Sequence, residues 1–239
     1  MQAAEDAPSL ALGAALLTRA HKLTTLELEV WGWRAAHTLA VALRRTLMAR
    51  VEGWAVVGLC VDGAAHALAR AEGVIEDVLG VAANAARIVF EGECGSRRVV
   101  KAVVRASAGV VTAGQLVLPE GLRVVNTNER VCSVGAGCVF RAEFVVARGV
   151  GYMRAAQARA RWSRVLAGYT VVDAHFSPVK RVSYKVSSAE DDRSCDRAQL
   201  VIETNGVDGA HAVVDACREL SRCFQLVGCS IARQLGVRA

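Results

Sequence analysis

Apolar and polar residues alternate along several short segments of this 239-residue chain. Between Thr24 and Val30, apolar Leu26, Leu28 and Val30 alternate with polar residues. A period of two places successive side chains on opposite faces, so this pattern predicts a half-buried strand. The same reasoning, with turn residues between the segments, predicts further strands at residues 55–61, 64–69, 98–105, 116–118, 123–125, 139–146, 179–187 and 198–204.

Residues 36–50 follow a helical period instead. Three leucines recur every four residues and therefore stack on one helix face, and arginines lie beside that row. The leucines are Leu39, Leu43 and Leu47, and the arginines are Arg44, Arg45 and Arg50. We expect an amphipathic helix whose apolar seam is covered and whose guanidinium groups are available to an anionic or carbonyl-rich partner.

Two more helices are predicted. One begins at Gly73 and runs to about Arg87, and the other follows Asp208, a good N-cap residue, and runs to about Leu235. Gly228 is expected to kink or weaken the last helix. Its apolar residues at helical spacing are Leu220, Phe224 and Val227.

The two ends of the chain therefore resemble each other, because both combine strands with a helix, whereas the middle is rich in strands. This order predicts an α+β protein with one domain inserted into another. We expect a discontinuous domain of strands and two packed helices, formed by residues 1–50 and 173–239, and an inserted β-rich domain, residues 51–172. Residues 1–22 give no clear signal.

Composition and charge narrow the class of protein. Hydrophobic residues make up 53% of the chain and charged residues 22%, which is typical of a globular protein. The net charge is +6, as expected for a partner of nucleic acid or of acidic proteins. Most arginines are scattered rather than gathered in blocks, so a stand-alone basic nucleic-acid-binding module is only the alternative interpretation. Residues 153–168 are basic and predict a surface loop or short helix.

The eight cysteines include no CxxC pair, and no cysteine–histidine set has zinc-ligand spacing. We therefore expect reduced, mostly buried thiols and no metal or cofactor. No uncharged run reaches 18 residues, which argues against a transmembrane helix. Acidic Glu5 and Asp6 stand where a signal peptide would be basic, so no signal peptide is expected.

The sequence contains no catalytic motif. A P-loop, an HExxH zinc motif and a nucleophile elbow are missing, and the five histidines are dispersed. Glu76 and Asp77 lie near the start of a predicted helix, where a favourable interaction with the helix dipole is a simpler explanation than a catalytic carboxylate pair. This favours a binding and assembly protein over a self-contained enzyme.

A series of short motifs runs in order from about residue 24 to 227. Their sequences are His37-Thr38-Leu39, Ala42-Leu43-Arg44-Arg45-Thr46-Leu47, Glu52-Gly53, Val61-Asp62-Gly63 with His66, Gly73-Val74, Glu76-Asp77-Val78, Asn84, Val111-Thr112-Ala113, Arg148-Gly149, Gly151-Tyr152, Val172-Asp173-Ala174, Phe176-Ser177-Pro178-Val179, Arg181-Val182, Tyr184, Arg193, Asp196, Leu200 and Glu203-Thr204-Asn205-Gly206. In this order and spacing the chain resembles the amino-terminal assembly module of the alpha subunit of bacterial-type DNA-directed RNA polymerase.

The resemblance implies a homodimer that binds the beta subunit and then beta-prime, with the metal-binding carboxylates of nucleotidyl transfer in the large subunits. DNA would be reached only through the assembled enzyme, and no cofactor or membrane is implied. The residues implied at the dimer interface are Thr38, Leu39, Leu43, Leu47, Leu220, Phe224 and Val227. Those implied in binding the large subunits are Arg44, Arg45, Met48, His66, Glu76, Asp77, Arg148, Gly149, Gly151, Tyr152, Ser177, Pro178 and Arg181.

The chain also departs from the family pattern. Ala40-Val41 stands where the family usually has Gly-Asn, Met153 replaces a proline, and Arg87 lies one position after an absent family lysine. The sequence stops after the last predicted helix, so we expect no counterpart of the family's carboxy-terminal DNA-binding domain. We expect a cytoplasmic protein, and a plastid stroma fits equally.

Overall fold

The computed structural model of the chain describes residues 11–19, 22–31, 35–64, 66–188 and 195–235. These residues form two compact units. The terminal unit comprises residues 1–51 and 178–239, and the inserted unit comprises residues 52–177. The second border therefore lies five residues later than predicted, because the segment up to Ser177 packs with the inserted unit. The predicted α+β class is confirmed.

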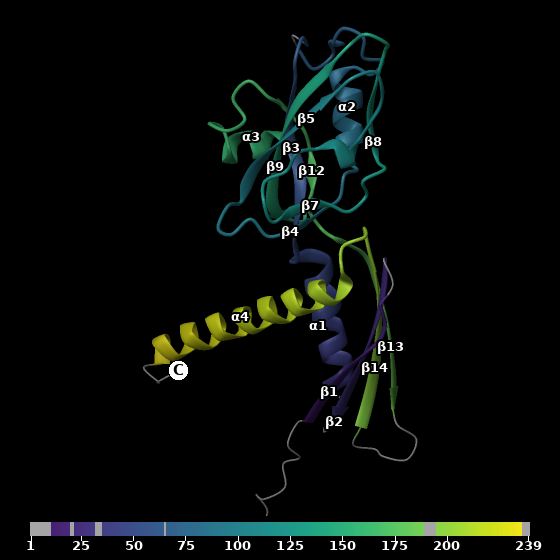
Figure 1. The fold of residues 1–239 in the computed structure, drawn as a ribbon. Helices are drawn as coiled ribbons and strands as arrows, with labels where there is room; N and C mark the ends of the chain where they lie inside the picture. The colour runs from purple at the N-terminus through teal and green to yellow at the C-terminus, as the bar shows by residue number, and fades with distance from the viewer. Residues whose placement is uncertain (1–10, 20–21, 32–34, 65, 189–194, 236–239) are drawn as a thin grey trace, which may run out of the picture. The chain divides into compact units, whose positions relative to one another are not determined.

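The terminal unit is built on a four-stranded antiparallel sheet. Its strands, in spatial order, are β1 (Ala11–Arg19), β2 (Leu23–Trp31), β14 (Cys195–Thr204) and β13 (Val179–Ser188). Helices α1 (Ala35–Ala49) and α4 (Gly209–Leu235) complete the unit (Figure 1). The alternation in β2 correctly predicted the burial of Leu26 and Leu28, whereas β1 carries no alternating pattern and was missed.

Helix α1 packs one face into the core of this unit. The face consists of Ala36, Ala40, Leu43 and Leu47, which follow helical spacing and are almost fully buried. Leu39 lies at the edge of this face and is only partly buried. Leu43 and Leu47 are therefore covered within one protomer, which leaves little of either side chain for the predicted dimer interface. Ala40 has no exposed surface, so a small apolar side chain fits where the family has glycine.

The inserted unit contains a six-stranded sheet with the central order β5, β9, β3, β4, β7, and with β11 paired to β3. Two short strand pairs, β6–β8 and β10–β12, accompany it. The bounds are β3 Glu52–Val61, β4 Phe90–Gly92, β5 Val99–Ala106, β6 Gly109–Thr112, β7 Leu122–Val124, β8 Arg130–Val134, β9 Phe140–Val150, β10 Tyr152–Met153, β11 Thr170–Val171, β12 Ala174–His175, α2 Val78–Ala85 and α3 Ala155–Arg161, with a 3-10 turn at Ala113–Gln115.

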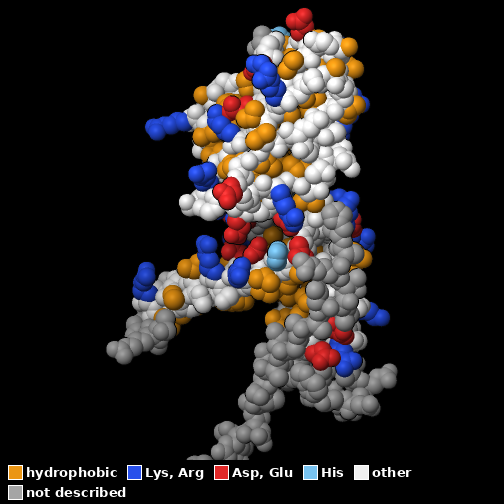
Figure 2. Space-filling view, in the orientation of Figure 1, with side chains coloured by type: hydrophobic (Ala, Val, Ile, Leu, Met, Phe, Trp, Pro, Cys, Tyr) orange, Lys and Arg blue, Asp and Glu red, His pale blue; other side chains and the backbone are white. Residues whose placement is uncertain are grey.

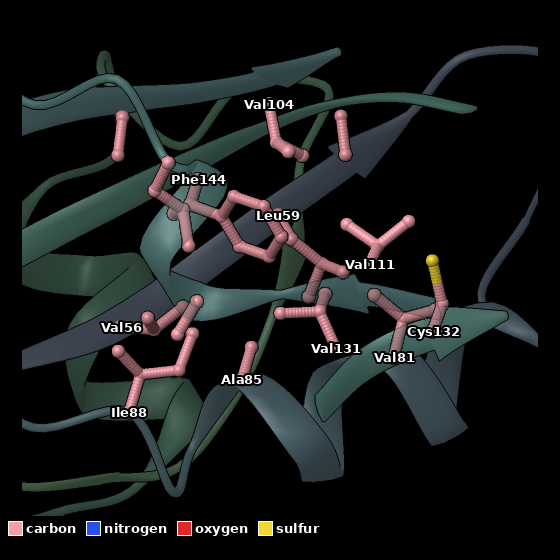
Figure 3. Packing of buried hydrophobic residues seen from close by; sticks show 14 of the residues in the cluster. Val56, Leu59, Val81, Ala85, Ile88, Val104, Val111, Val131, Cys132 and Phe144 are labelled. Carbon is pink, nitrogen blue, oxygen red and sulfur yellow. The ribbon is translucent and has the colours of Figure 1, made fainter. Parts of the chain in front are cut away.

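Two hydrophobic cores lie on opposite faces of β9. The larger core contains Phe140 and Phe144 and packs against α2 (Figure 3). The smaller core contains Val145 and Ala147 and packs against Ala158 of α3. Because side chains alternate along a strand, even-numbered residues of β9 from 140 to 146 face α2, and odd-numbered residues from 141 to 147 face α3.

Three predictions for the inserted unit were wrong. Residues 64 and 66–69 contain a bend and a turn rather than a strand, and the carbonyl oxygens of Ala67 and Ala69 accept hydrogen bonds from the start of α2. Helix α2 begins at Val78 rather than Gly73, because Asp77 is its N-cap. The strand predicted at 139–146 ends too early, since β9 continues to Val150.

The long helix α4 is continuous across Gly228, so the predicted kink is absent there. Asp208 does act at its start, where Oδ1 accepts a hydrogen bond from the amide of Ala210 at 3.0 Å. None of the helices in the described part of the chain is long and apolar enough to cross a membrane.

We predict that Leu47→Ala lowers the free energy of unfolding of the terminal unit by about 2–5 kcal/mol, because a fully buried side chain is removed from its core. The neighbouring Met48→Ala removes a side chain that is 41% exposed and should cost far less. Chemical denaturation of both variants at low protein concentration measures the difference. Equal stabilities would contradict the packing of Leu47 inside one protomer.

Candidate protein-binding surfaces

The two arginines of α1 are used differently. The Nε of Arg44 donates a hydrogen bond to the backbone oxygen of Val182 on β13 at 3.2 Å, so Arg44 helps to fix the helix on the sheet. Arg45 is exposed and has no hydrogen-bond or ion-pair partner among the described residues. Met48 lies one turn after Arg45 and is also exposed. Arg45 and Met48 thus form a small surface that is available to a partner.

Helix α4 carries an apolar face that is longer than the core of its own unit. Ala212 and Ala216 are buried against the sheet and α1, and Leu220 is partly buried. The same face continues toward the carboxyl end with steps of three or four residues, where its side chains are exposed (Figure 2). These residues are Phe224 (71% exposed), Val227 (57%), Ile231 (50%) and Leu235 (70%).

We call these four residues the α4 stripe. The sequence prediction included Phe224 and Val227 and missed Ile231 and Leu235, although the same spacing continues to them. The 27-residue helix is about 40 Å long, and only its first turns are packed. Apolar area of this kind on a helix indicates a binding surface.

An ion pair lies where the packed part of α4 ends. The Nη2 of Arg50, just after α1, lies 2.8 Å from Oε1 of Glu219 on α4. The hydrogen bond from Arg50 lowers the pKa of the Glu219 carboxyl. This contact links the two helices of the terminal unit, so Arg50 is engaged within the protomer. Thr38, another residue predicted at the dimer interface, is exposed on α1.

Glu76 and Asp77 have structural roles in the inserted unit. The Oδ1 of Asp77 accepts a hydrogen bond from the amide of Gly80 at 2.7 Å and caps α2. Glu76 binds Arg130 at 2.5 Å and accepts a hydrogen bond from the amide of Ser133 at 2.8 Å. Burial alone would raise the pKa of Glu76, but these hydrogen bonds outweigh it and hold the pKa below its ordinary value. Asp77 therefore acts at the start of a helix, as the sequence predicted.

Several motif residues from distant positions meet at the end of β9. Arg148 Nε lies 3.0 Å from Oε2 of Glu52. Gly149 packs under the Phe176 ring, because a Cβ at position 149 would lie 2.8 Å from that ring. Gly151 has a φ of +64°, a conformation that glycine adopts without strain. These four residues and the ring of Phe176 belong to motifs that the sequence resemblance singled out.

Tyr152 and Asp173 connect this end of β9 to α3. The Tyr152 hydroxyl donates a hydrogen bond to Asp173, whose other oxygen accepts one from the amide of Ala155 at 2.7 Å. The hydrogen bond raises the pKa of Tyr152 and lowers that of Asp173. Tyr152 remains more than half exposed, so its ring presents apolar surface.

The other residues predicted to bind the large subunits do not gather at one surface. His66 and Arg181 are exposed, whereas Ser177 and Pro178 are buried at the point where the chain leaves one unit for the other. Arg87 lies 2.7 Å from Glu129 and donates a hydrogen bond to Asn84, so it is engaged within the inserted unit. The motif residue Arg193 falls outside the described part of the chain.

The cysteines contradict one expectation. Of the seven cysteines with described side chains, only Cys132 is buried, and Cys60, Cys217, Cys223 and Cys229 are exposed. Burial raises the pKa of the Cys132 thiol to about 12. Within the described residues, no three His, Cys, Asp or Glu side chains come together in a way that could hold a metal ion.

Comparison with known protein families gives one match. Residues 57–177, just over half of the chain, match the family described as "RNA polymerase Rpb3/RpoA insert domain". The matched residues coincide with the inserted unit, except for its first five residues.

We predict that Glu76→Gln lowers the unfolding free energy of the inserted unit by about 1–3 kcal/mol at neutral pH, because a charged hydrogen-bond acceptor is lost. The folded-state pKa of Glu76 is lowered, so its stabilisation is complete above the ordinary carboxyl pKa and is lost as the pH falls through the lowered value. Denaturation at neutral and acidic pH should therefore show the difference shrinking with acid. Glu72→Gln, at an exposed turn residue, is the control, and a pH-independent difference would refute the charge-based explanation.

Proposed function

The chain belongs to the RNA polymerase Rpb3/RpoA insert-domain family, and on this premise we propose that two copies of it form the scaffold on which the large polymerase subunits assemble. The observation that carries the proposal is the exposed α4 stripe. In this proposal the dimer binds beta first and beta-prime second, in the cytoplasm. The subunit takes part in a nucleotidyltransferase without contributing catalytic residues, and the metal-binding carboxylates belong to the large subunits.

A second copy of the chain is the occupant that best fits the α4 stripe. The stripe continues the face that α4 buries in the core of the terminal unit. A partner that covers the stripe would therefore form a hydrophobic core continuous with this one. Two copies related by a twofold axis place the same apolar surface on each other, as in most homodimers. Phe224 and Ile231 supply the large aromatic and branched side chains that dominate such interfaces.

The surface formed by Arg45 and Met48 is the proposed contact for a large subunit. The Arg45 guanidinium has no partner among the described residues and can bind a carboxylate or backbone oxygens in a fork. The exposed thioether of Met48 provides adaptable apolar contact beside it. Arg181, exposed on β13, is proposed for the same class of contact.

We predict that Phe224→Asp raises the dissociation constant of the dimer by at least about 100-fold, because each protomer loses about 1.5–3 kcal/mol of burial and gains a charge in an apolar contact. Sedimentation analysis across a range of concentrations measures this. Leu226→Asp is the matched control, since Leu226 is 59% exposed but lies off the stripe. A Phe224→Asp chain that dimerises like the control would exclude this interface.

We predict that Arg45→Ala leaves the dimer intact but weakens capture of the beta subunit by about 10- to 100-fold, as expected for the loss of hydrogen bonds from a charged donor. The measurement is binding of purified beta to the immobilised dimer. Arg218→Ala serves as control, because Arg218 is an exposed helical arginine on α4. Unchanged capture by the Arg45→Ala dimer would remove Arg45 from the proposed contact.

A further inference from the structure

The sheet of the inserted unit has a basic face that the proposed assembly does not use. We call the face that α3 covers, opposite α2, the outer face. On β5, Val100, Ala102 and Val104 are buried in the core beneath α2, so Arg105 points to the outer face. Arg141 on β9 alternates in the same way.

Arg105 and Arg141 are direct cross-strand neighbours. They are paired in the antiparallel register of β5 and β9, and both are exposed. Side chains of such a pair lie on the same face, and like charges directly opposite each other are destabilising. Neither guanidinium has an ion-pair partner within the described residues. The isolated fold therefore carries a repulsion that a bound anion would relieve.

Helix α3 brings further positive charge to the same face. Its Ala158 packs on Val145 and Ala147 of β9, the residues that share the outer face with Arg141. Three exposed arginines lie on α3 or just after it, and none is ion-paired among the described residues. They are Arg159, Arg161 and Arg164. Figure 2 shows Lys and Arg side chains on the side of the inserted unit where Figure 1 places α3.

Acidic residues do little to balance this charge. Residues 153–172 contain no aspartate or glutamate. Glu143 lies on the outer face, but it pairs with Lys101 at 2.5 Å and accepts a hydrogen bond from the hydroxyl of Tyr169. The hydrogen bond from Lys101 lowers the pKa of Glu143. Asp173 is held by Tyr152 and Ala155.

We propose that the outer face binds the phosphate backbone of duplex DNA without reading its sequence. Guanidinium groups match phosphate oxygens in a planar fork, and arginine is the basic residue that this face uses most. A single strand would need exposed rings for base stacking. Trp162 is partly buried in the smaller core, and the Arg161 guanidinium lies 5.3 Å from its ring centroid. Among the described residues, this leaves Tyr152 as the one well-exposed ring beside α3, which is too few for stacking successive bases.

This inference goes beyond the scaffold function. It differs from the expectation that DNA is reached only through the assembled enzyme, and it assigns the contact to the inserted unit rather than to α1 or α4. Its test needs neither dimerisation nor a large subunit, so it stands or fails separately from the proposed assembly role.

The test is binding of the purified full-length chain to a fluorescent DNA duplex of arbitrary sequence, followed by anisotropy at several salt concentrations. Two variants, Arg105→Gln/Arg141→Gln and Arg161→Gln/Arg164→Gln, each remove two charges from the outer face. Each should bind about 10- to 100-fold more weakly than the wild type at low salt, and the slope of log affinity against log salt should fall by about 2.

A matched variant controls for net charge. Arg70→Gln/Arg222→Gln also removes two positive charges, but Arg70 lies in the segment before α2, and Arg222 is exposed on α4 of the terminal unit. It should bind DNA nearly as well as the wild type. Thermal unfolding is the second readout, because Arg105→Gln/Arg141→Gln removes a like-charge pair and should not lower the melting temperature.

The proposal is overturned if the control variant loses as much affinity as the two outer-face variants, or if those variants keep the affinity and salt slope of the wild type. Tighter binding of a single-stranded RNA of equal length would exclude duplex DNA as the ligand. Tighter binding of polyglutamate would instead assign the face to an acidic protein.

Discussion

The apolar face of α4 is the constraint on which the terminal unit depends. Its first turns are buried against the sheet and α1, whereas the same face continues in the α4 stripe, which no described residue covers. A helix that exposes a continuous apolar stripe requires a partner, because water contact with this area opposes the hydrophobic effect. The proposed homodimer follows from this single requirement.

The two units of the chain have different roles in the proposed function. The terminal unit supplies the α4 stripe and the exposed Arg45, and both belong to the proposed scaffold. In the inserted unit, which the family match covers, most charged motif residues form contacts within the unit itself. Glu76 fixes α2 to β8, and Arg148 is paired with Glu52. The outer-face arginines are different because they are exposed, and two of them, Arg105 and Arg141, are cross-strand neighbours.

The sequence predicted those features that depend on local period. The helix at 36–50, the final helix with its N-cap at Asp208 and the alternation in β2 were all correct within a few residues. Periodicity identifies an apolar face but not its cover. The family resemblance implied a dimer interface for Leu43 and Leu47, whereas the protomer itself buries both side chains. Resemblance to a family gave the assembly role, which no local pattern contains.

Other features depend on contacts between distant residues. From the sequence, the arginines were interpreted as scattered. Arg105 and Arg141 are 36 positions apart, and only the strand register makes them neighbours. The turn at residues 66–69 could not be distinguished from a strand, because it is stabilised by hydrogen bonds from the start of α2 rather than by a local pattern. Strand β1 was missed because its apolar residues do not alternate.

Hydrogen exchange of the backbone amides of α4, measured at high and at low concentrations of the chain, tests the central claim most directly. If a second copy covers the stripe, amides in residues 221–235 are protected at high concentration and lose protection on dilution, whereas those of residues 210–218 change much less. Exchange in residues 221–235 that is rapid and independent of concentration would contradict the account.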